Sequence, residues 1–280
     1  MTKLSMSRRR FLQSTGAAAI WLPTTVKGYT ASEIQALYVD GEMQEDVSKW
    51  ELDTPCLCVD LDLLETNIAA MESTVNQNGI ASRPHAKTHK TPVIAQMQLD
   101  SGSVGICTAK ISEAEAMYQN GIDEILMTTT NVTPTKIRRA MNLRQENPRF
   151  VQATDSSQNA RLLSEAASAM GITAEVVVDV DPGGHRTGIT PGAPSLELAQ
   201  LIDSLPSLNL RGLLCYDGGS QHVKGFEERK NQTLERLAGA TDTFDLFNQS
   251  GLSTEIFSGG GTGTYTVSYT HLTLPTILLV

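Results

Sequence analysis

This chain has few basic residues relative to acidic ones, no paired cysteine motif and no long apolar run. Its 280 residues contain 22 Lys and Arg against 31 Asp and Glu, which gives a formal net charge of −9. An acidic chain is poorly suited to nucleic acid or an anionic membrane surface, so neither is expected as a partner. No CxxC pair of the kind that holds a metal is present. This composition is typical of a soluble enzyme that acts on small molecules.

The four cysteines are expected to be small buried hydrophobic residues rather than disulfide partners. Cys56 and Cys58 alternate along an apparently extended segment, 55–60, and would point to the same face. Cys107 and Cys215 lie in apolar, strand-like runs. A protein that folds in the reducing cytosol has no need of disulfides.

Strand-like and helix-like segments alternate along most of the chain. Periodicity predicts helices over 63–78, 91–99, 111–120, 135–146, 157–170, 195–204 and 226–241. Apolar runs predict strands over 81–85, 104–108, 124–127, 149–153, 174–179, 208–216 and 254–258. Asp155 is expected to cap its helix in a capping box with Gln158. Repeated strand–helix units with short buried strands indicate a parallel sheet with right-handed crossovers.

The number of strands bears on the fold. Seven strands are counted from residue 81 onward, whereas a closed barrel of strand–helix units has eight. The residues that carry chemistry, described below, lie at the ends of many different strands, as they do in TIM-type barrels. We therefore expect an α/β fold, an incomplete (β/α)8 TIM-type barrel with about seven strands. A doubly wound open sheet is the alternative.

Residues 83–90, with the sequence RPHAKTHK, form the most informative motif. A Lys between two His residues at a strand end is unusual in a structural role. A partly desolvated Lys loses its proton and can form a Schiff base with a carbonyl. The motif resembles the cofactor-lysine motif of the D-threonine aldolase and D-serine dehydratase family, pyridoxal-phosphate enzymes built on the alanine-racemase type of barrel. The resemblance implies that Lys87 binds pyridoxal 5'-phosphate covalently; a basic surface turn is the alternative.

A glycine-rich loop with a single arginine follows the strand expected over 174–179. Its sequence, DVDPGGHRTG over residues 179–188, resembles the family's loop whose Arg faces the pyridine nitrogen of the cofactor. That role is carried to Arg186. A guanidinium does not give up its proton, so the ring nitrogen would stay unprotonated and the ring would be a weaker electron sink. A salt-bridged loop Arg is the alternative.

Two further site residues come from the segment LCYDGGSQH, residues 214–222. It resembles the family's Tyr-x-Gly-x-x-Gln-His stretch, which implies Tyr216 beside the cofactor and Gln221 near its rim. His89 lies two residues beyond Lys87, so strand alternation could bring both into one cavity. Lys87, His89 and Tyr216 are thus the candidate catalytic residues. A core Tyr and a packing His remain the alternatives.

The run SGGGTGT follows the last expected strand and should open a helix. Consecutive glycines let backbone N–H groups approach an anion, and a helix N-terminus adds partial positive charge. The run resembles the family's phosphate loop and lacks the Gly-Lys-Ser/Thr of a P-loop. The residues it assigns to the cofactor phosphate are Ser258, Gly259, Gly260, Gly261, Thr262, Gly263 and Thr264.

The resemblance covers a barrel domain over 52–266. Family members continue with a C-terminal β domain whose His-x-Cys or His-x-Asp pair binds a divalent metal, Zn or Mn. No such segment is found here, so we expect that domain and its metal to be missing, with no metal ligand in this chain. The chain would then be an inactive fragment, and the full-length form a homodimer.

The sequences at both ends of the chain do not resemble the barrel domain. Residues 1–31 resemble a twin-arginine export signal, with SRRRFLQ over 7–13 and an apolar run over 16–22. Such export moves folded proteins and implies a periplasmic location; a cytosolic protein with a basic arm is the alternative. Residues 267–280 begin VSYTHLTLPT, which matches the translation of a common sequencing adapter, so we expect an artefact rather than a genuine apolar strand. Without it, the first and seventh strands would have unpaired edges.

The resemblance implies a pyridoxal-phosphate-dependent lyase that acts on D-3-hydroxy amino acids. A D-threonine-aldolase-like cleavage would give glycine and an aldehyde, with a metal polarising the hydroxyl. The alternatives are a D-serine-dehydratase-like β-elimination, an amino-acid racemase, and a non-catalytic pyridoxal-phosphate carrier. The extended segment 55–60 disfavours the carrier, because two-domain members use such a segment in their second domain.

Overall fold

The computed structural model describes residues 28–40, 42–267 and 277–279. Most of the export-signal-like segment and most of the adapter-like tail therefore lie outside the described residues. The chain divides into two compact units, Met1–Leu64 and Glu65–Val280. Among the described residues, no helix is both long and apolar enough to cross a membrane.

The first unit contains short elements that are fixed by local capping. Helix α1 (Ala31–Ala36) is followed by an antiparallel pair, β1 (Tyr38–Val39) and β2 (Glu42–Met43), and by a 3-10 turn, η1 (Lys49–Glu51). Both helical elements begin with a capping box, from Thr30 with Glu33 and from Ser48 with Glu51. Each box satisfies backbone N–H groups that a helix start leaves without partners.

Residues 55–60 do not form a strand, and this corrects one prediction. Cys56 and Cys58 are exposed, and Leu57 between them is 101% exposed. The segment pairs with neither β1 nor β2, and all of its residues are exposed. The prediction of burial holds for Cys107 and Cys215 only, because both lie within the parallel sheet of the second unit.

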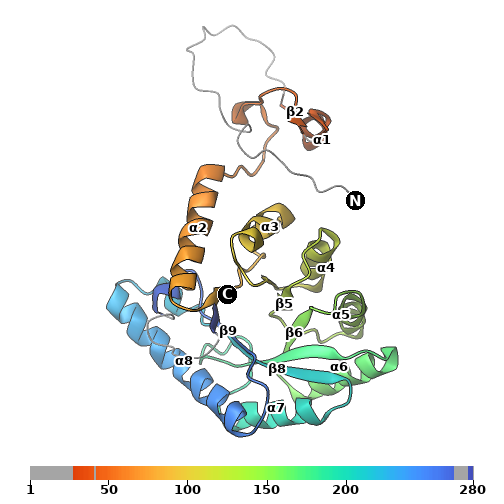
Figure 1. Ribbon diagram of the computed structural model, residues 1–280, viewed down its shortest axis with the longest axis vertical. Coiled ribbons are helices and arrows are strands. Elements are labelled where there is room, and N and C mark those ends of the chain that lie inside the picture. Colours follow the sequence, from red (N-terminus) through yellow and green to blue (C-terminus); the bar gives the residue numbers. More distant parts are fainter. Residues whose placement is uncertain (1–27, 41, 268–276, 280) are drawn as a thin grey trace. The chain divides into compact units, whose positions relative to one another are not determined.

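The second unit is built on an eight-stranded parallel sheet (Figure 1). Its strands are β3 (Ala81–Ser82), β4 (Ile106–Thr108), β5 (Ile125–Met127), β6 (Val151–Thr154), β7 (Ala174–Asp179), β8 (Leu208–Cys215), β9 (Ile256–Gly259) and β10 (Ile277–Leu279). The order is β3-β10-β9-β8-β7-β6-β5-β4, and every neighbouring pair is parallel. The seven predicted strands, β3 to β9, are confirmed. From β4 to β10, strands that follow one another along the chain are neighbours in the sheet.

The two ends of this sheet are joined beyond β3. His85 forms a parallel bridge with Cys107 on β4. The Ala86 N–H donates to the Cys107 carbonyl at 2.8 Å, and the Cys107 N–H donates to the Pro84 carbonyl at 2.8 Å. This pairing turns the row of strands into a ring, so the TIM-type barrel is confirmed over the open sheet.

One helix precedes the first strand of the ring, and the others connect successive strands and cover the outside of the ring (Figure 1). They are α2 (Leu61–Gln77), α3 (Pro92–Asp100), α4 (Ile111–Gln119), α5 (Pro134–Glu146), α6 (Ser157–Met170), α7 (Ala193–Ser204) and α8 (Phe226–Gln249). All seven predicted helices are present, and α8 continues past the expected end at Thr241. The predicted cap of α6 is wrong: Ser156 is the N-cap, and its hydroxyl accepts from the Asn159 N–H. A hydroxyl one residue nearer to the helix replaces Asp155 in that role.

Strand alternation separates two apolar layers. Ile125, Val176 and Phe257 belong to a large cluster that packs the strands against the helices. Residues of the opposite parity form a second, smaller cluster inside the ring: Cys107, Leu126, Val151, Ala153, Val177, Leu214 and Ile256. Because side chains alternate between faces, residues two positions beyond this inner cluster also face inward.

The adapter-like tail contributes the last strand. Leu278 of β10 pairs with Ser258 of β9 and with Ala81 of β3, so both neighbouring edges are occupied. The expectation of unpaired edges concerned a chain without this tail, and it stays a prediction. Three residues suffice, because a gap between two parallel edges offers backbone hydrogen-bond partners on both sides.

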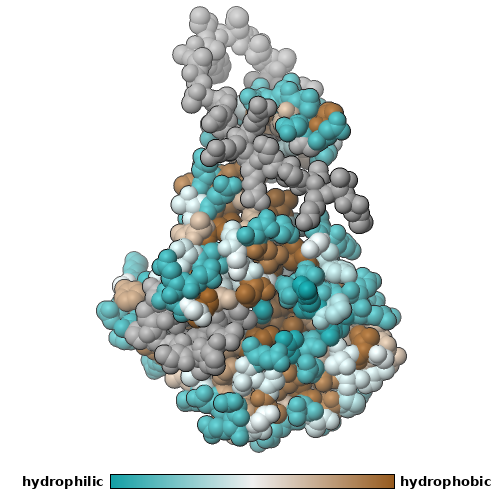
Figure 2. Space-filling model, viewed as in Figure 1, coloured by the Kyte–Doolittle hydropathy of each residue, from teal (hydrophilic) through white to brown (hydrophobic). Residues whose placement is uncertain are grey.

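The large exposed apolar side chains of the barrel unit are scattered among its described residues. Figure 2 shows hydrophilic and apolar residues interspersed on one face. The large exposed apolar side chains in this unit are Val93, Val104, Val132, Leu162 and Phe226. They come from five separate elements or loops, and such scattered residues do not mark a docking site.

Gly212 on β8 gives a test of the ring. Its φ is +128°, and an added Cβ would fall on the Ile256 carbonyl of β9. We expect Gly212→Ala to lower the free energy of unfolding by about 3 kcal/mol or more, through backbone strain and overpacking. Urea titration followed by circular dichroism measures this.

Gly171→Ala is the matched control, because Gly171 has a φ of +66° with no atom within 4 Å of an added Cβ. It should cost about 1 kcal/mol, the strain of the left-handed conformation alone. Equal losses in the two variants would show that β8 and β9 do not approach as described.

Candidate active site

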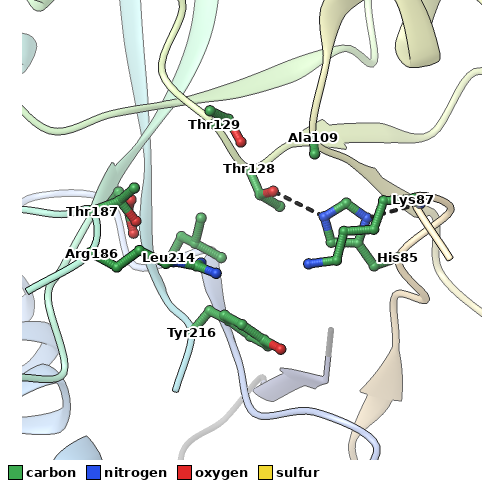
Figure 3. A pocket seen from close by; sticks show the side chains of 10 residues that line it. His85, Lys87, Ala109, Thr128, Thr129, Arg186, Thr187, Leu214 and Tyr216 are labelled. Atoms are coloured by element: carbon green, nitrogen blue, oxygen red, sulfur yellow. Dashed lines mark hydrogen bonds between the residues drawn. The ribbon is translucent and has the colours of Figure 1, made fainter. Parts of the chain in front are cut away.

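Five inward positions at the carboxyl ends of the strands continue the inner apolar layer. Two residues beyond Cys107, Leu126, Val177, Leu214 and Ile256 come Ala109, Thr128, Asp179, Tyr216 and Ser258. The first four line a cavity of about 140 Å³. His85, Lys87, Thr129, Arg186, Thr187 and Leu214 complete the lining (Figure 3). The candidate site thus lies at the end of the barrel where enzymes of this fold carry their chemistry.

The ring closure also places Lys87. Immediately after the Ala86 amide is paired with β4, the chain turns, and the Lys90 N–H returns to the Ala86 carbonyl at 2.7 Å. Lys90 has a φ of +52°, a left-handed conformation that tightens this turn. Lys87 therefore projects from a short turn that is anchored to the barrel wall at its first residue.

Lys87 and Arg186 approach the same aromatic ring. Lys87 Nζ and Arg186 Cζ each lie 5.2 Å from the centroid of the Tyr216 ring. In Figure 3 the two cationic groups point toward one another across the cavity. Both side chains are exposed, so this part of the cavity is open. The structure brings together three residues predicted from three distant motifs.

The charge of Lys87 is disfavoured where it lies. Partial burial lowers the pKa of its ammonium group, and the positive charge of Arg186 lowers that pKa further. By area the side chain is still exposed, so the shift reflects local desolvation of the amine rather than full burial. An amine with a lowered pKa has a larger neutral fraction, which is the form that attacks a carbonyl.

His85 lies in the cavity, although the sequence analysis singled out His89. Its Nε2 lies 3.2 Å from Thr128 Oγ1, and its Nδ1 lies 3.3 Å from the Lys87 backbone nitrogen. Burial, then Lys87, then Arg186 lower the pKa of His85 to about 3. The signal that could have found it is parity: His85 and Lys87 are two residues apart, as are His89 and Lys87.

His89 and His222 do not line the smaller cavity. The His89 Nδ1 accepts from the Thr91 N–H at 3.0 Å, so its ring caps the start of α3. Burial lowers the pKa of His89. His222 lines an adjoining cavity of about 420 Å³, together with Asp217 and Arg236. The assignment of His89 as a catalytic residue remains a prediction without support from this arrangement.

Asp179 is a second residue that the sequence analysis left without a role. It is 4% exposed at the end of β7 and lines both cavities. Burial raises the pKa of its carboxyl to about 7, and a hydrogen bond with Thr187 opposes that rise. Near neutral pH the site therefore holds a carboxyl group that is only partly ionised.

Gln221 connects Tyr216 to the glycine-rich loop. Its Nε2 donates to the Tyr216 hydroxyl at 2.7 Å, and its Oε1 accepts from the Gly263 N–H at 3.0 Å. An added Cβ on Gly261 would lie 2.6 Å from Gln221 Oε1, and one on Gly263 would lie 2.8 Å from Gln221 Cβ. At Gly263 the neighbouring atoms include the Gln221 backbone, so only glycine fits there, whereas a side chain at Gly261 would displace the Gln221 amide group. The loop therefore presents bare backbone beside Gln221.

The rest of the loop follows the predicted pattern. Ser258 and Gly259 end β9, and helical structure begins at Tyr265. Ser258 Oγ is buried without a hydrogen-bond partner among the described residues. No group of three or more His, Cys, Asp or Glu residues is placed to hold a metal ion in the part of the chain that the structure describes.

The family comparison agrees with this site. The sequence model of the family described as "Alanine racemase, N-terminal domain" matches residues 59–275. That match covers well over half of the chain, and the chain therefore belongs to this family. The matched region includes Lys87, Arg186, Tyr216 and the glycine-rich loop.

Within this family, the chain is similar to several aldolases of known sequence or structure. The chain is 37% identical over 216 residues to the 3-hydroxy-D-aspartate aldolase of Paracoccus denitrificans, and 36% identical over 212 residues to the D-threonine aldolase of an Arthrobacter species. These alignments cover 77% and 76% of this chain. The crystal structure of D-threonine aldolase from Filomicrobium marinum is 34% identical, with a TM-score of 0.78, over 82% of this chain and 62% of that chain.

The likeness is to part of each relative. Each of the two aldolase alignments covers 56% of the relative's length, so the chain spans about half of the proteins it matches. The D-threo-3-hydroxyaspartate dehydratase of Delftia is 29% identical, again over 56% of its length. The barrel is thus shared by aldolases and by a dehydratase.

Asp179 makes the stability of the protein depend on pH. Its folded-state pKa of about 7 is above the ordinary value of 3.8, so its favourable contribution is full below pH 3.8 and is lost as pH rises to about 7. Asparagine does not ionise. The free energy of unfolding of Asp179→Asn should therefore rise relative to that of the wild type as pH increases from 4 to 8, by on the order of 2–4 kcal/mol in total.

Urea titrations at several pH values measure this difference. The exposed Asp203→Asn is the control, and its difference from the wild type should stay constant across the same range. If the curves for Asp179→Asn and the wild type run parallel, the carboxyl is not held protonated by burial.

Proposed function

We propose that this chain is the cofactor-binding barrel of a pyridoxal-phosphate-dependent lyase that acts on D-3-hydroxy amino acids. The proposed reaction is retro-aldol cleavage to glycine and an aldehyde. The observation that carries the proposal is a lysine with a lowered pKa that faces Tyr216 and Arg186 in an open cavity. The aldolase relatives support the choice of substrate class.

The residues present fit pyridoxal phosphate. Lys87 would bind its aldehyde carbon, and Tyr216 and Arg186 would flank the ring. The glycine-rich loop, residues 258–264, would hold the phosphate, because Gly259 and Gly263 leave no room for side chains and Ser258 Oγ has no other partner among the described residues. Gln221 fixes the Tyr216 hydroxyl against this loop.

The chemistry divides between the cofactor and this chain. When bound, pyridoxal phosphate supplies an electron-withdrawing imine that stabilises negative charge on the substrate carbon. Arg186 keeps its proton at any accessible pH, so it offers a bound ring a hydrogen-bond donor and no proton. Asp179, half ionised near pH 7, lies where it can balance part of the positive charge of Arg186.

A dehydratase is the second candidate. The Delftia dehydratase shares the barrel, with a TM-score of 0.72 and 27% identity to its solved structure. We propose that the segment beyond the barrel, with a divalent Zn or Mn ion and a homodimer contact, decides between the two reactions. We also propose that the twin-arginine-like leader directs the protein to the periplasm.

Lys87 gives the direct test of cofactor binding. Pyridoxal phosphate followed by borohydride should leave a pyridoxyl group on the peptide that contains Lys87, because this amine is neutral more often than an ordinary lysine amine. Lys87→Ala should abolish that label, and Lys90→Ala should retain it. Peptide mapping by mass spectrometry is the measurement. A label on Lys90 in the wild type would contradict the assignment.

Product analysis distinguishes the reactions. The holoprotein is given D-threonine, D-3-hydroxyaspartate and D-serine, with and without a chelator. An aldolase should release glycine and an aldehyde from D-threonine, whereas a dehydratase should release an oxo acid and ammonia. Release of the L-enantiomer alone would indicate a racemase. Stable cofactor binding without turnover is expected both of an inactive fragment and of a carrier, so turnover is the result that distinguishes the reactions.

A further inference from the structure

The ring of His85 is held at both nitrogens, and this arrangement fixes its protonation. Nδ1 lies 3.3 Å from the Lys87 backbone nitrogen, and Nε2 lies 3.2 Å from Thr128 Oγ1. The two partners lie on opposite sides of the ring in Figure 3. The hydrogen-bonding capacity of each partner, as donor or as acceptor, determines which ring nitrogen carries the proton.

At Nδ1 the proton must be absent. A backbone N–H is only a donor, so the bond between the Lys87 N–H and Nδ1 requires an unprotonated nitrogen. Protonation of Nδ1 would break this bond and leave two donors facing each other. The backbone of Lys87 would lose its contact with the barrel wall at that point.

At Nε2 the proton must be present. Thr128 has a single hydroxyl proton, and it is donated to the Thr108 carbonyl at 3.2 Å. A carbonyl only accepts, so Thr128 Oγ1 has lone pairs left and no proton for His85. Nε2–H therefore donates to Thr128 Oγ1, and the ring is the neutral Nε2–H tautomer.

The charged surroundings act in the same direction. Burial, Lys87, Arg186 and His89 all lower the pKa of His85, whose value is about 3. The Cys107 backbone raises that pKa by a smaller effect. A second positive charge beside Lys87 and Arg186 is thus disfavoured throughout the physiological range.

We propose that His85 is a positioning residue, locked as the neutral Nε2–H tautomer between Thr128 and Lys87, that fixes the backbone of the cofactor lysine. This role rests on the proposed function of Lys87. It excludes His85 as a general acid or base, since a ring with both nitrogens engaged has no free lone pair and no free proton for a substrate. It also keeps the ionisation of Lys87 independent of any histidine titration.

Nuclear magnetic resonance of the cofactor-free protein tests the tautomer. The chain has five histidines, and the loss of one set of imidazole signals in His85→Asn assigns His85. Long-range ¹H–¹⁵N spectra from pH 5 to 8.5 should show one protonated and one unprotonated nitrogen with no shift across the range. A His85 signal that titrates in that range would overturn the proposal.

Borohydride trapping of pyridoxal phosphate on Lys87 tests the positioning role. His85→Asn keeps an acceptor in the place of Nδ1, because an Asn side chain accepts from the N–H two residues on. His85→Leu keeps bulk but has no acceptor. Trapping should be within about threefold of the wild type for His85→Asn and about tenfold slower for His85→Leu, as expected for one lost hydrogen bond. The pH midpoint of trapping should be the same in all three proteins.

The other outcomes are also informative. Equal rates for His85→Asn and His85→Leu, or a shifted pH midpoint in either, would overturn the positioning role. Thr128→Val, which removes the acceptor for Nε2–H, should move the His85 nitrogen signals and serves if His85→Leu fails to fold. If the wild type traps no pyridoxyl group on Lys87, the proposed function fails, while the spectra still decide the tautomer.

Discussion

The short backbone pairing between residues 84–86 and β4 determines both the fold and the site. Two hydrogen bonds to Cys107 close a row of parallel strands into a ring. The same two bonds hold the residues on either side of His85 and end one residue before Lys87. Because the wall and the lysine turn share one anchor, the reactive amine is placed first by main-chain geometry, to which the ring of His85 adds one hydrogen bond. A change that weakened this pairing would therefore both open the barrel and displace Lys87.

The sequence was sufficient wherever a residue's position follows from strand parity and a short motif. Lys87, Arg186 and Tyr216 come from three motifs about 30 to 130 residues apart, yet a parallel barrel brings all strand ends to one face. The glycines at 261 and 263 could be predicted because a backbone cradle needs residues without side chains. The order of the strands and helices followed from periodicity, since buried parallel strands are short apolar runs and their helices are amphipathic.

The sequence was insufficient wherever an answer depends on a partner from elsewhere in the chain. His85 and His89 have the same parity relative to Lys87, and only the tight turn at Lys90 separates them. Apolar, alternating character at 55–60 suggested burial for Cys56 and Cys58, but burial requires a second layer, and composition carries no information about it. The pKa of Asp179 depends on how deeply β7 is covered, which no local pattern records.

The electrostatics of the cavity show how the residues could serve a cofactor with a phosphate and a basic ring. Lys87 and Arg186 are two cations near one another, which is unfavourable until a negative group arrives or one of them loses its proton. Partial burial lowers the pKa of Lys87, and Arg186, which cannot lose its proton, lowers that pKa further. A neutral His85 adds no third charge, and a partly protonated Asp179 adds less than a full negative one. The reactivity of the amine therefore depends on its partial burial and on the permanent charge of Arg186, and conditions that titrate His85 or Asp179 should change it little.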